Sequence, residues 1–321
     1  MIKDYNLFLL KEAISMSNQD IVEIIKSLET KDNKNFALIK KLVNHKDAQG
    51  KTVLMNIIQS NNEELLDYVL NFNPDVNQVT KNTGYNELFF CKSVKIFKKI
   101  WDLGVNIKHK SVGLDRTVLI ELASKKVFNI DLYQSIIDSG VDISWIDRNK
   151  QSVLSFLVSN RKAVNFLIKN NVNLNGKDQG QVFWPLMYEV KYSKNPNYIK
   201  TAVPIILDLF EAGLKLETTT YLTQFFEHMK IDEIYDLLEK IKNSITDNDM
   251  RTIYNATNRF FNNDNISYPY VENAKKLLSL GTYPEFYKYL KLSYSNGRFE
   301  KLFADYIAEH PYLEDIDKYN L

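Results

Sequence analysis

The sequence is short of the residues that most catalytic and metal sites require. It has one cysteine, Cys91, and four histidines that show no ligand-like spacing to one another or to that cysteine. An intrachain disulfide is therefore excluded, and no zinc site is indicated. The ten glycines form no phosphate-binding loop (G-x-x-x-x-G-K-S/T or G-x-G-x-x-G) and no hydrolase elbow (G-x-S-x-G). We expect no catalytic residue, no bound metal and no cofactor.

An excess of charge of one sign and a long apolar run are also missing. The 41 basic and 40 acidic side chains give a formal net charge of +1, whereas nucleic acids and anionic membranes attract proteins with a basic field. No uninterrupted apolar segment approaches the roughly 20 residues that span a bilayer. Lys11 interrupts the first apolar stretch before the core of a signal peptide could form. We expect a cytoplasmic protein, or one in a host cytoplasm if it is a secreted effector, with no nucleic-acid or membrane partner.

What the sequence does have is a repeated pattern. Hydrophobic residues make up 45% of it, enough for a sizeable core. Residues 47–77 contain a turn, an apolar segment of helical period over 52–59, a polar break and a second such segment over 64–70. Each segment is shorter than the roughly 12 to 15 residues at which an isolated helix is even marginal. Each pair of short helices must therefore be covered by a neighbouring pair.

The turn that opens this unit has recognisable chemistry. Asp47 and Gly50 occupy the first and fourth positions of a type I turn, in which the carboxylate accepts a local backbone N–H. Thr52 stands where the N-cap of the first helix belongs. The same order of turn and two helices recurs, with erosion, at a period of about 33 residues. These later units begin near Lys81, Ser111, Asp147 and Asp178.

These units resemble ankyrin repeats, whose pattern is D-x-x-G-x-T-P-L-H-x-A-A, a second helix ending in L-L, and G-A-D-V-N. The residues of the best unit in that register are Asp47, Gly50, Thr52, Leu54, Leu65, Leu66, Leu70, Asp75, Val76 and Asn77. The family's histidine, which helps to tie adjacent turns by hydrogen bonds, is replaced here by Met55, Phe89, Ile120, Ser155 and Met187. The resemblance therefore implies an array held mainly by apolar contacts, with looser turns.

The predicted fold class is all-α, an ankyrin-like helical-repeat solenoid with degenerate helical repeats or a cap at its C-terminal end. Residues 1–46 are predicted to form an N-terminal helical cap or degenerate repeat, and residues 47–216 the ankyrin-like repeats. Helical periodicity without the turn signature continues through residues 217–321. That segment is either further degenerate repeats or a separate helical domain.

Candidate binding residues are the large or polar side chains at turn tips, which stacking of the units does not require. Such a solenoid presents an extended concave surface built from turn tips and first helices. Aromatic residues and arginine are typical hot spots of protein interfaces, contributing about 2 kcal/mol or more each. The predicted partner-binding residues are Gln49, Tyr85, Arg116, Trp145, Arg148, Asn149, Phe183 and Trp184.

Structural roles compete with this interpretation at three of these aromatic positions. Trp145 could instead staple one unit to the next, and either Phe183 or Trp184 could be a hydrophobic staple at the helix that begins near Pro185. Trp101, on a second helix, is expected in the core.

The resemblance implies a non-catalytic protein that binds another protein through its concave face. The abundance of Asn, Lys, Ile and Tyr is typical of a protein encoded by an AT-rich genome, such as that of a bacterium or a virus. For a protein from such a source we expect an effector, an immunity protein or a defence inhibitor. The alternative is an enzyme whose active site lies in the C-terminal hundred residues, with the repeats as a recruiting arm. Its first candidate residues are Arg259, Asp264, Tyr268 and Glu272. The oligomeric state stays open, with a homodimer through the C-terminal segment as one possibility.

Overall fold

The computed structural model describes residues 36–176, 198–215, 231–244, 275–280, 284–293 and 298–311, together with single positions at 182, 186, 247 and 250. Apart from one isolated bridge between Lys46 and Thr52, the secondary structure of these residues is helical, which confirms the all-α class. The chain divides into two compact units between Leu157 and Val158. No helix in the described part of the chain has the length and apolar character needed to cross a membrane.

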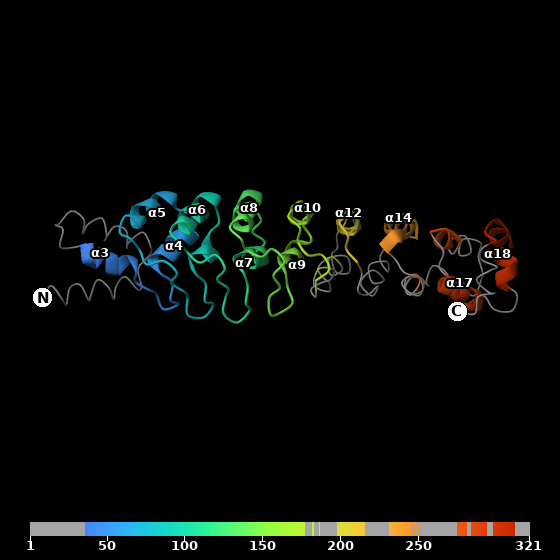
Figure 1. Ribbon diagram of the computed structural model, residues 1–321, viewed down its shortest axis with the longest axis horizontal. Coiled ribbons are helices and arrows are strands. Elements are labelled where there is room, and N and C mark those ends of the chain that lie inside the picture. The colour runs from blue at the N-terminus through green and yellow to red at the C-terminus, as the bar shows by residue number, and fades with distance from the viewer. Residues whose placement is uncertain are drawn as a thin grey trace. The chain divides into compact units, whose positions relative to one another are not determined.

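Unit 1, which ends at Leu157, consists of short helices separated by hairpin loops (Figure 1). Its described helices are α3 (Phe36–Val43), α4 (Val53–Ser60), α5 (Glu63–Leu70), the 3₁₀ helix η2 (Glu87–Phe90), α6 (Val94–Asp102), α7 (Val118–Ser124), α8 (Ile130–Asp138) and α9 (Val153–Leu157). The first helices contact one another in chain order, α4 against η2, η2 against α7 and α7 against α9. Among the second helices, α6 packs on α8. Helices too short to be stable alone are thus covered by their neighbours.

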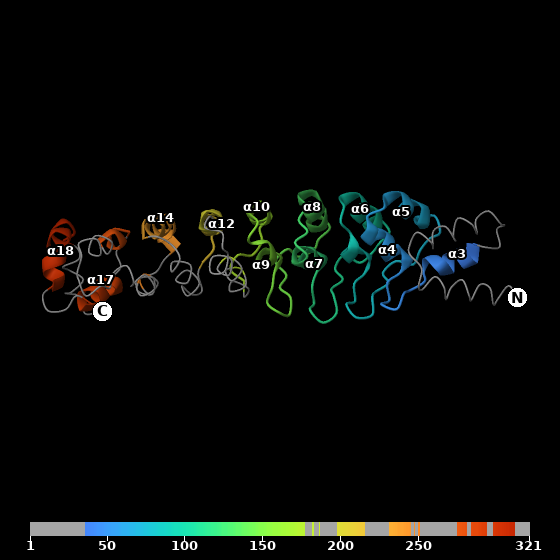
Figure 2. The same cartoon turned by 180° about the vertical axis from the view of Figure 1, so that it is seen from behind.

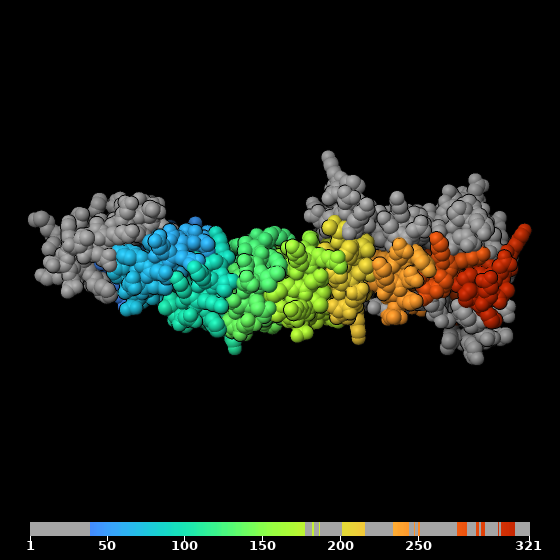
Figure 3. Space-filling model, turned by 90° about the horizontal axis from the view of Figure 1, so that it is seen from above, coloured from blue at the N-terminus to red at the C-terminus, as the bar shows by residue number. Residues whose placement is uncertain are grey.

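The hairpins of unit 1 extend on the side away from α5, α6 and α8, as both faces of the ribbon show (Figures 1 and 2). Seen from above, the side chains of consecutive segments of this unit adjoin in chain order (Figure 3). The predicted apolar face of the first helix is confirmed, because Leu54, Ile57 and Ile58 of α4 are completely buried.

A short polar side chain closes each hairpin of unit 1. Asp47 Oδ1 accepts hydrogen bonds from the amides of Gln49 and Lys51, both at 2.9 Å, as the turn chemistry predicted. Thr80, Ser111 and Asp147 perform the same closure in the following hairpins. The first helices are then capped by the side chains of Thr52, Asn86, Thr117 and Ser152. These local hydrogen bonds explain why the chain repeats its hairpin although its sequence varies.

One backbone hydrogen bond joins each hairpin to the next. The donors are the amides of Lys81, Val112 and Arg148, and the acceptors are the carbonyls of Gln49, Thr83 and Leu114, at 2.8 to 3.0 Å. Asn77 adds a side-chain link, because its Oδ1 accepts from the amide of Asn106 at 2.6 Å. The expectation of looser turns, which rested on the missing histidine, stays a prediction. The bonds seen between the hairpins come from the backbone and do not depend on that histidine.

Trp101 does not lie in the core, contrary to expectation. It is 38% exposed, and its ring stacks on the buried Phe97 with the centroids 6.3 Å apart. The core positions of α6 are Ile96, Phe97 and Ile100. Trp101 follows them in the last turn of the helix, where its outer face is left uncovered.

Unit 2 begins at Val158. Its described helices are α10 (Arg161–Lys169), α12 (Tyr198–Glu211), α14 (Ile231–Ile241), the 3₁₀ helix η3 (Lys242–Ser244), α17 (Pro284–Ser293) and α18 (Arg298–Glu309). Helix α12 packs against both α10 and α14. Arg161 binds both carboxylate oxygens of Asp208, at 2.6 and 2.8 Å, which lowers the pKa of Asp208. Asn175 accepts from the amide of Lys215 at 2.7 Å and donates to the carbonyl of Gly213, the same pair of bonds that Asn77 makes in unit 1.

The predicted boundaries at residues 46 and 216 stay predictions. Residues 1–35 of the predicted N-terminal cap lie outside the described residues, as does most of the segment from 217 onward.

Candidate functional site

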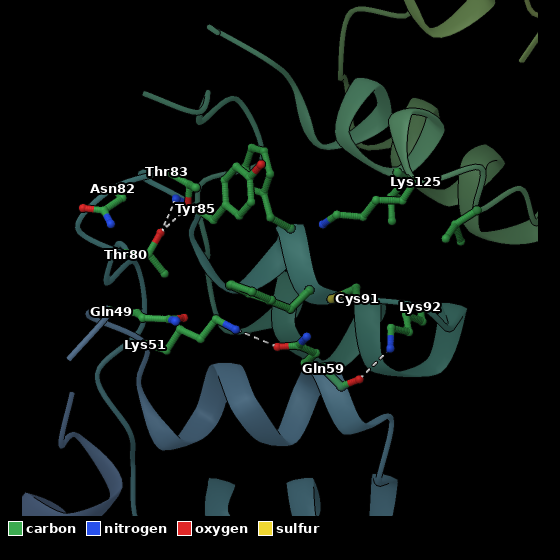
Figure 4. Close-up of a pocket in the computed structure, with 14 residues that line it drawn as sticks. Gln49, Lys51, Gln59, Thr80, Asn82, Thr83, Tyr85, Cys91, Lys92 and Lys125 are labelled. Carbon is green, nitrogen blue, oxygen red and sulfur yellow. Dashed lines mark hydrogen bonds between the residues drawn. The ribbon is translucent and has the colours of Figure 1, made fainter. Parts of the chain in front are cut away.

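A hollow of about 600 Å³ lies in unit 1 where two hairpins, the end of α4, η2 and the end of α7 meet (Figure 4). We call it the hairpin pocket. Its lining residues are Gln49, Lys51, Gln59, Thr80, Asn82, Thr83, Tyr85, Phe89, Phe90, Cys91, Lys92, Leu122, Lys125 and Val127. Three of them are lysines, and none of the described lining residues is an aspartate or a glutamate. The volume is within the range of small-ligand sites, which is about 300 to 1,000 Å³.

Aromatic rings form one wall of the hairpin pocket. Tyr85 stacks on Phe89 with the centroids 4.8 Å apart and the planes only 7° from parallel, and it meets Phe90 edge-on at 6.1 Å. Phe89 and Phe90 are buried, whereas Tyr85 is half-buried at the mouth. Neighbouring rings hold Tyr85 in place, so that the exposed part of its side chain is a rigid, largely apolar surface.

The pocket lysines surround this wall. Lys51 Nζ lies 5.2 Å from the Phe90 centroid and donates to Gln59 Oε1 at 2.9 Å. Lys92 Nζ donates to the backbone carbonyl of Gln59, also at 2.9 Å. That carbonyl belongs to the last turn of α4, where the helix dipole favours a cation. Figure 4 shows Lys51 and Lys92 converging on Gln59, with Lys125 extending toward the rings from another side.

Lys125 differs from the other two because it has a carboxylate partner. Its Nζ lies 3.0 Å from Glu121 Oε1 and 5.3 Å from the Tyr85 centroid. Glu121 is buried, and its other oxygen lies 3.5 Å from Arg116. Burial, and then a hydrogen bond to the Glu121 carboxylate, raise the pKa of Tyr85. The phenol is therefore neutral, and the Glu121 carboxylate offsets the charge of Lys125.

The structure brings some of the predicted binding residues together. Gln49 and Tyr85 line the hairpin pocket. Arg116 lies behind it, with its side chain only 14% exposed and its guanidinium between Glu121 and Asp147. Arg116 therefore supports the pocket and offers little surface to a partner.

The remaining candidates lie elsewhere. Trp145 Nε1 donates to the carbonyl of Asp115 in the preceding hairpin at 2.7 Å, and Lys110 lies over its ring, which fits the stapling role considered for it. Arg148 and Asn149 are exposed on the next hairpin. Phe183 and Trp184 lie outside the described residues.

The predicted partner-binding residues did not include Lys51, Lys92, Lys125 or Gln59. Lys92 and Lys125 follow the first helices of consecutive units, η2 and α7. That shared position was a detectable signal. The role of Gln59 depends on a contact between units and has no local signature.

No cluster of three or more metal-ligating side chains occurs within the part of the chain that the structure describes. The residues of the alternative active site, Arg259, Asp264, Tyr268 and Glu272, lie outside that part. The hairpin pocket itself offers ammonium donors, amide and hydroxyl groups and flat rings, a combination that suits binding of an anionic group carried on an apolar body. No protein-family model matches the chain, and no curated protein is significantly similar to it in sequence.

Proposed function

We propose that the chain is a non-catalytic, ankyrin-like repeat protein that binds another protein through the side formed by its hairpins and first helices. Three recurring features support the ankyrin-like assignment: hairpins closed by Asp, Thr or Ser, one backbone hydrogen bond between successive hairpins, and the asparagine link made by Asn77 and Asn175. In an ankyrin-like array this side is concave, and binding residues there are free of the packing between helices.

The hairpin pocket is the observation that carries this proposal. Stacking of the units requires buried apolar residues, and it does not require lysines gathered around the half-exposed ring of Tyr85. Aromatic side chains such as tyrosine are enriched among the anchor residues of protein interfaces. Within this function, an effector, an immunity protein or a defence inhibitor is the class that the Asn- and Lys-rich composition favours.

Affinity capture tests the proposal. The tagged full chain is incubated with an extract of its source cells or of their host, and bound proteins are quantified by mass spectrometry. A variant that reverses two pocket charges, Lys51→Glu with Lys92→Glu, should lose the partner. A matched variant on the second helices, Lys98→Glu with Lys162→Glu, should keep it, since both of those lysines are exposed and lie outside the pocket. Equal capture by all three proteins would refute binding through this side.

A further inference from the structure

We propose that the hairpin pocket receives an acidic segment of the partner protein, with an aspartate or glutamate side chain between the lysines and an adjacent apolar residue against Tyr85. This inference rests on the protein-binding function proposed above and specifies the chemistry of the partner. It is carried by the charge of the pocket and by how its lysines are paired.

Two described lysines of unit 1 outside the pocket pair with carboxylates, whereas Lys126 donates to the carbonyl of Phe156. Lys95 lies 3.0 Å from Glu63, and Lys99 lies 2.5 Å from Asp67. In the described part of the chain, Lys51 and Lys92 instead donate to the neutral oxygens of a single residue, Gln59. Two ammonium groups thus meet at one glutamine. The third lysine of the hollow, Lys125, is paired with Glu121. Since the chain as a whole is nearly neutral, this concentration of positive charge is a local property of the pocket.

A carboxylate entering this space can accept hydrogen bonds from the lysines while their bonds to Gln59 are kept. Each lysine has three N–H donors, and one of them suffices for Gln59. Ion-paired hydrogen bonds are stronger than those to a neutral oxygen. The rings beneath the lysines exclude water from one side, which strengthens the attraction of opposite charges.

The chemistry of the wall selects a polypeptide segment over a bare anion. Tyr85 is half-exposed, with Phe89 stacked on its ring, and an aromatic surface of this kind favours contact with an apolar or aromatic side chain. An acidic residue beside an apolar one satisfies both halves of the pocket. A nucleic acid would need a basic track along many phosphates, and the net charge of +1 does not favour such a track.

A random-peptide display library selected on the immobilised full chain tests this inference. Peptides recovered on the wild type should be enriched in Asp and Glu next to apolar residues. The same should hold for the Lys98→Glu, Lys162→Glu control. On the Lys51→Glu, Lys92→Glu variant, acidic residues should be lost and lysine or arginine gained. A selected acidic peptide should bind that variant at least about tenfold more weakly than the wild type.

Folding of each variant is checked by circular dichroism and by its thermal midpoint. If the Lys51→Glu, Lys92→Glu variant does not fold, Lys51→Gln with Lys92→Gln takes its place, because it removes the two charges without adding new ones. Peptides selected on that variant should likewise show no enrichment in Asp and Glu. Inorganic phosphate and ATP are titrated separately against the wild type. Tighter binding of ATP than of the selected peptides would overturn the inference in favour of a phosphate site.

The inference and the proposed function fail in different ways. Peptides without acidic residues that bind the wild type and not the Lys51→Glu, Lys92→Glu variant would overturn the acidic chemistry. They would still support protein binding at the pocket. Acidic enrichment that persists in the charge-reversed variant would also overturn the inference, because the acidic peptides would then bind elsewhere.

Discussion

Arg116 donates from Nε to Oδ2 of Asp147 at 2.9 Å, across 31 residues of sequence. The Asp147 side chain is completely buried, and its other oxygen closes its own hairpin by accepting from the amides of Asn149 and Gln151. A carboxylate that organises one hairpin is therefore neutralised by a cation from the hairpin before it. Because Arg116 also reaches Glu121 beside Tyr85, the same guanidinium connects the hydrogen bonds between hairpins to the wall of the pocket.

Replacing Arg116 with leucine should destabilise the protein strongly. The substitution leaves the buried carboxylates of Asp147 and Glu121 without their guanidinium partner. Breaking a buried ion pair from one side typically costs about 3 to 5 kcal/mol. We expect a loss of about 3 kcal/mol in the free energy of unfolding, since Lys125 still pairs with Glu121. Urea denaturation followed by circular dichroism measures it.

Arg148→Leu is the matched control for this substitution. Arg148 is exposed, and its amide, which donates to Leu114, is retained in the variant. The expected change is within about 0.5 kcal/mol. Similar losses for the two variants would mean that the buried ion pair contributes no more than a surface arginine.

The local features of the repeat were predictable from the sequence because their partners lie within a few residues. Asp47 bonds to amides two and four residues ahead, and Thr52 caps the helix through Met55. Such bonds depend on residue type and spacing alone. The hairpins and the short helices followed directly from them.

The pocket and the ion pairs were not predictable in this way. Gln59 receives Lys92 across 33 residues, and Arg116 reaches Asp147 across 31. Which side chains meet at such separations depends on how one unit stacks on the next. A single sequence gives the period of the repeat without fixing that contact, so Arg116 was predicted as a binding residue whereas it forms a buried ion pair.

Asn77 should contribute more to stability than its exposure suggests. Its side chain accepts from the amide of Asn106 and donates to the carbonyl of Gly104, and its backbone has a positive φ of 65°. Asn77→Ala removes two hydrogen bonds and places alanine in a left-handed conformation. We expect a loss of about 2 to 3 kcal/mol in the free energy of unfolding.

Asn73→Ala separates these two contributions. Asn73 is exposed and has a positive φ of 48°, so its replacement incurs mainly the backbone cost of about 1 kcal/mol. The difference between the two alanine variants, measured in urea, reports the hydrogen bonds of Asn77. If both lose the same stability, the link between Asn77 and Asn106 makes no net contribution.

Gly84 and Gly113 form a second matched pair. Both have positive φ, 62° and 84°, so alanine is strained at either position. A Cβ on Gly84 would clash with Cγ2 of Val112 and lie 3.1 Å from the Val112 amide nitrogen, which belongs to the bond between hairpins. A Cβ on Gly113 would meet nothing within 4 Å. We expect Gly84→Ala to lose about 1 to 2 kcal/mol more than Gly113→Ala in the free energy of unfolding. The reverse order would contradict the close contact of the two hairpins.

Cys91 should make the protein less stable at alkaline pH. The thiol is completely buried, and its burial, followed by the nearby Glu87 carboxylate, raises its pKa far above the ordinary value. The unfolded chain releases the thiol proton from about pH 8.5, whereas the folded chain retains it. The contribution of the thiol to the free energy of unfolding is therefore complete below the pKa that the thiol has in the unfolded chain. It falls as the pH rises above that pKa, by up to about 1.4 kcal/mol per pH unit.

Comparison with Cys91→Ala isolates this effect, because the lysines and tyrosines titrate in both proteins. The alanine variant should be less stable at neutral pH, since it leaves a small void in the core. Between about pH 8 and about pH 10, however, the wild type should lose more stability than the variant, by about 2 kcal/mol. Urea denaturation at a series of pH values measures both curves. Parallel curves would show that the thiol ionises as easily in the folded chain as in the unfolded one, which would be incompatible with its complete burial.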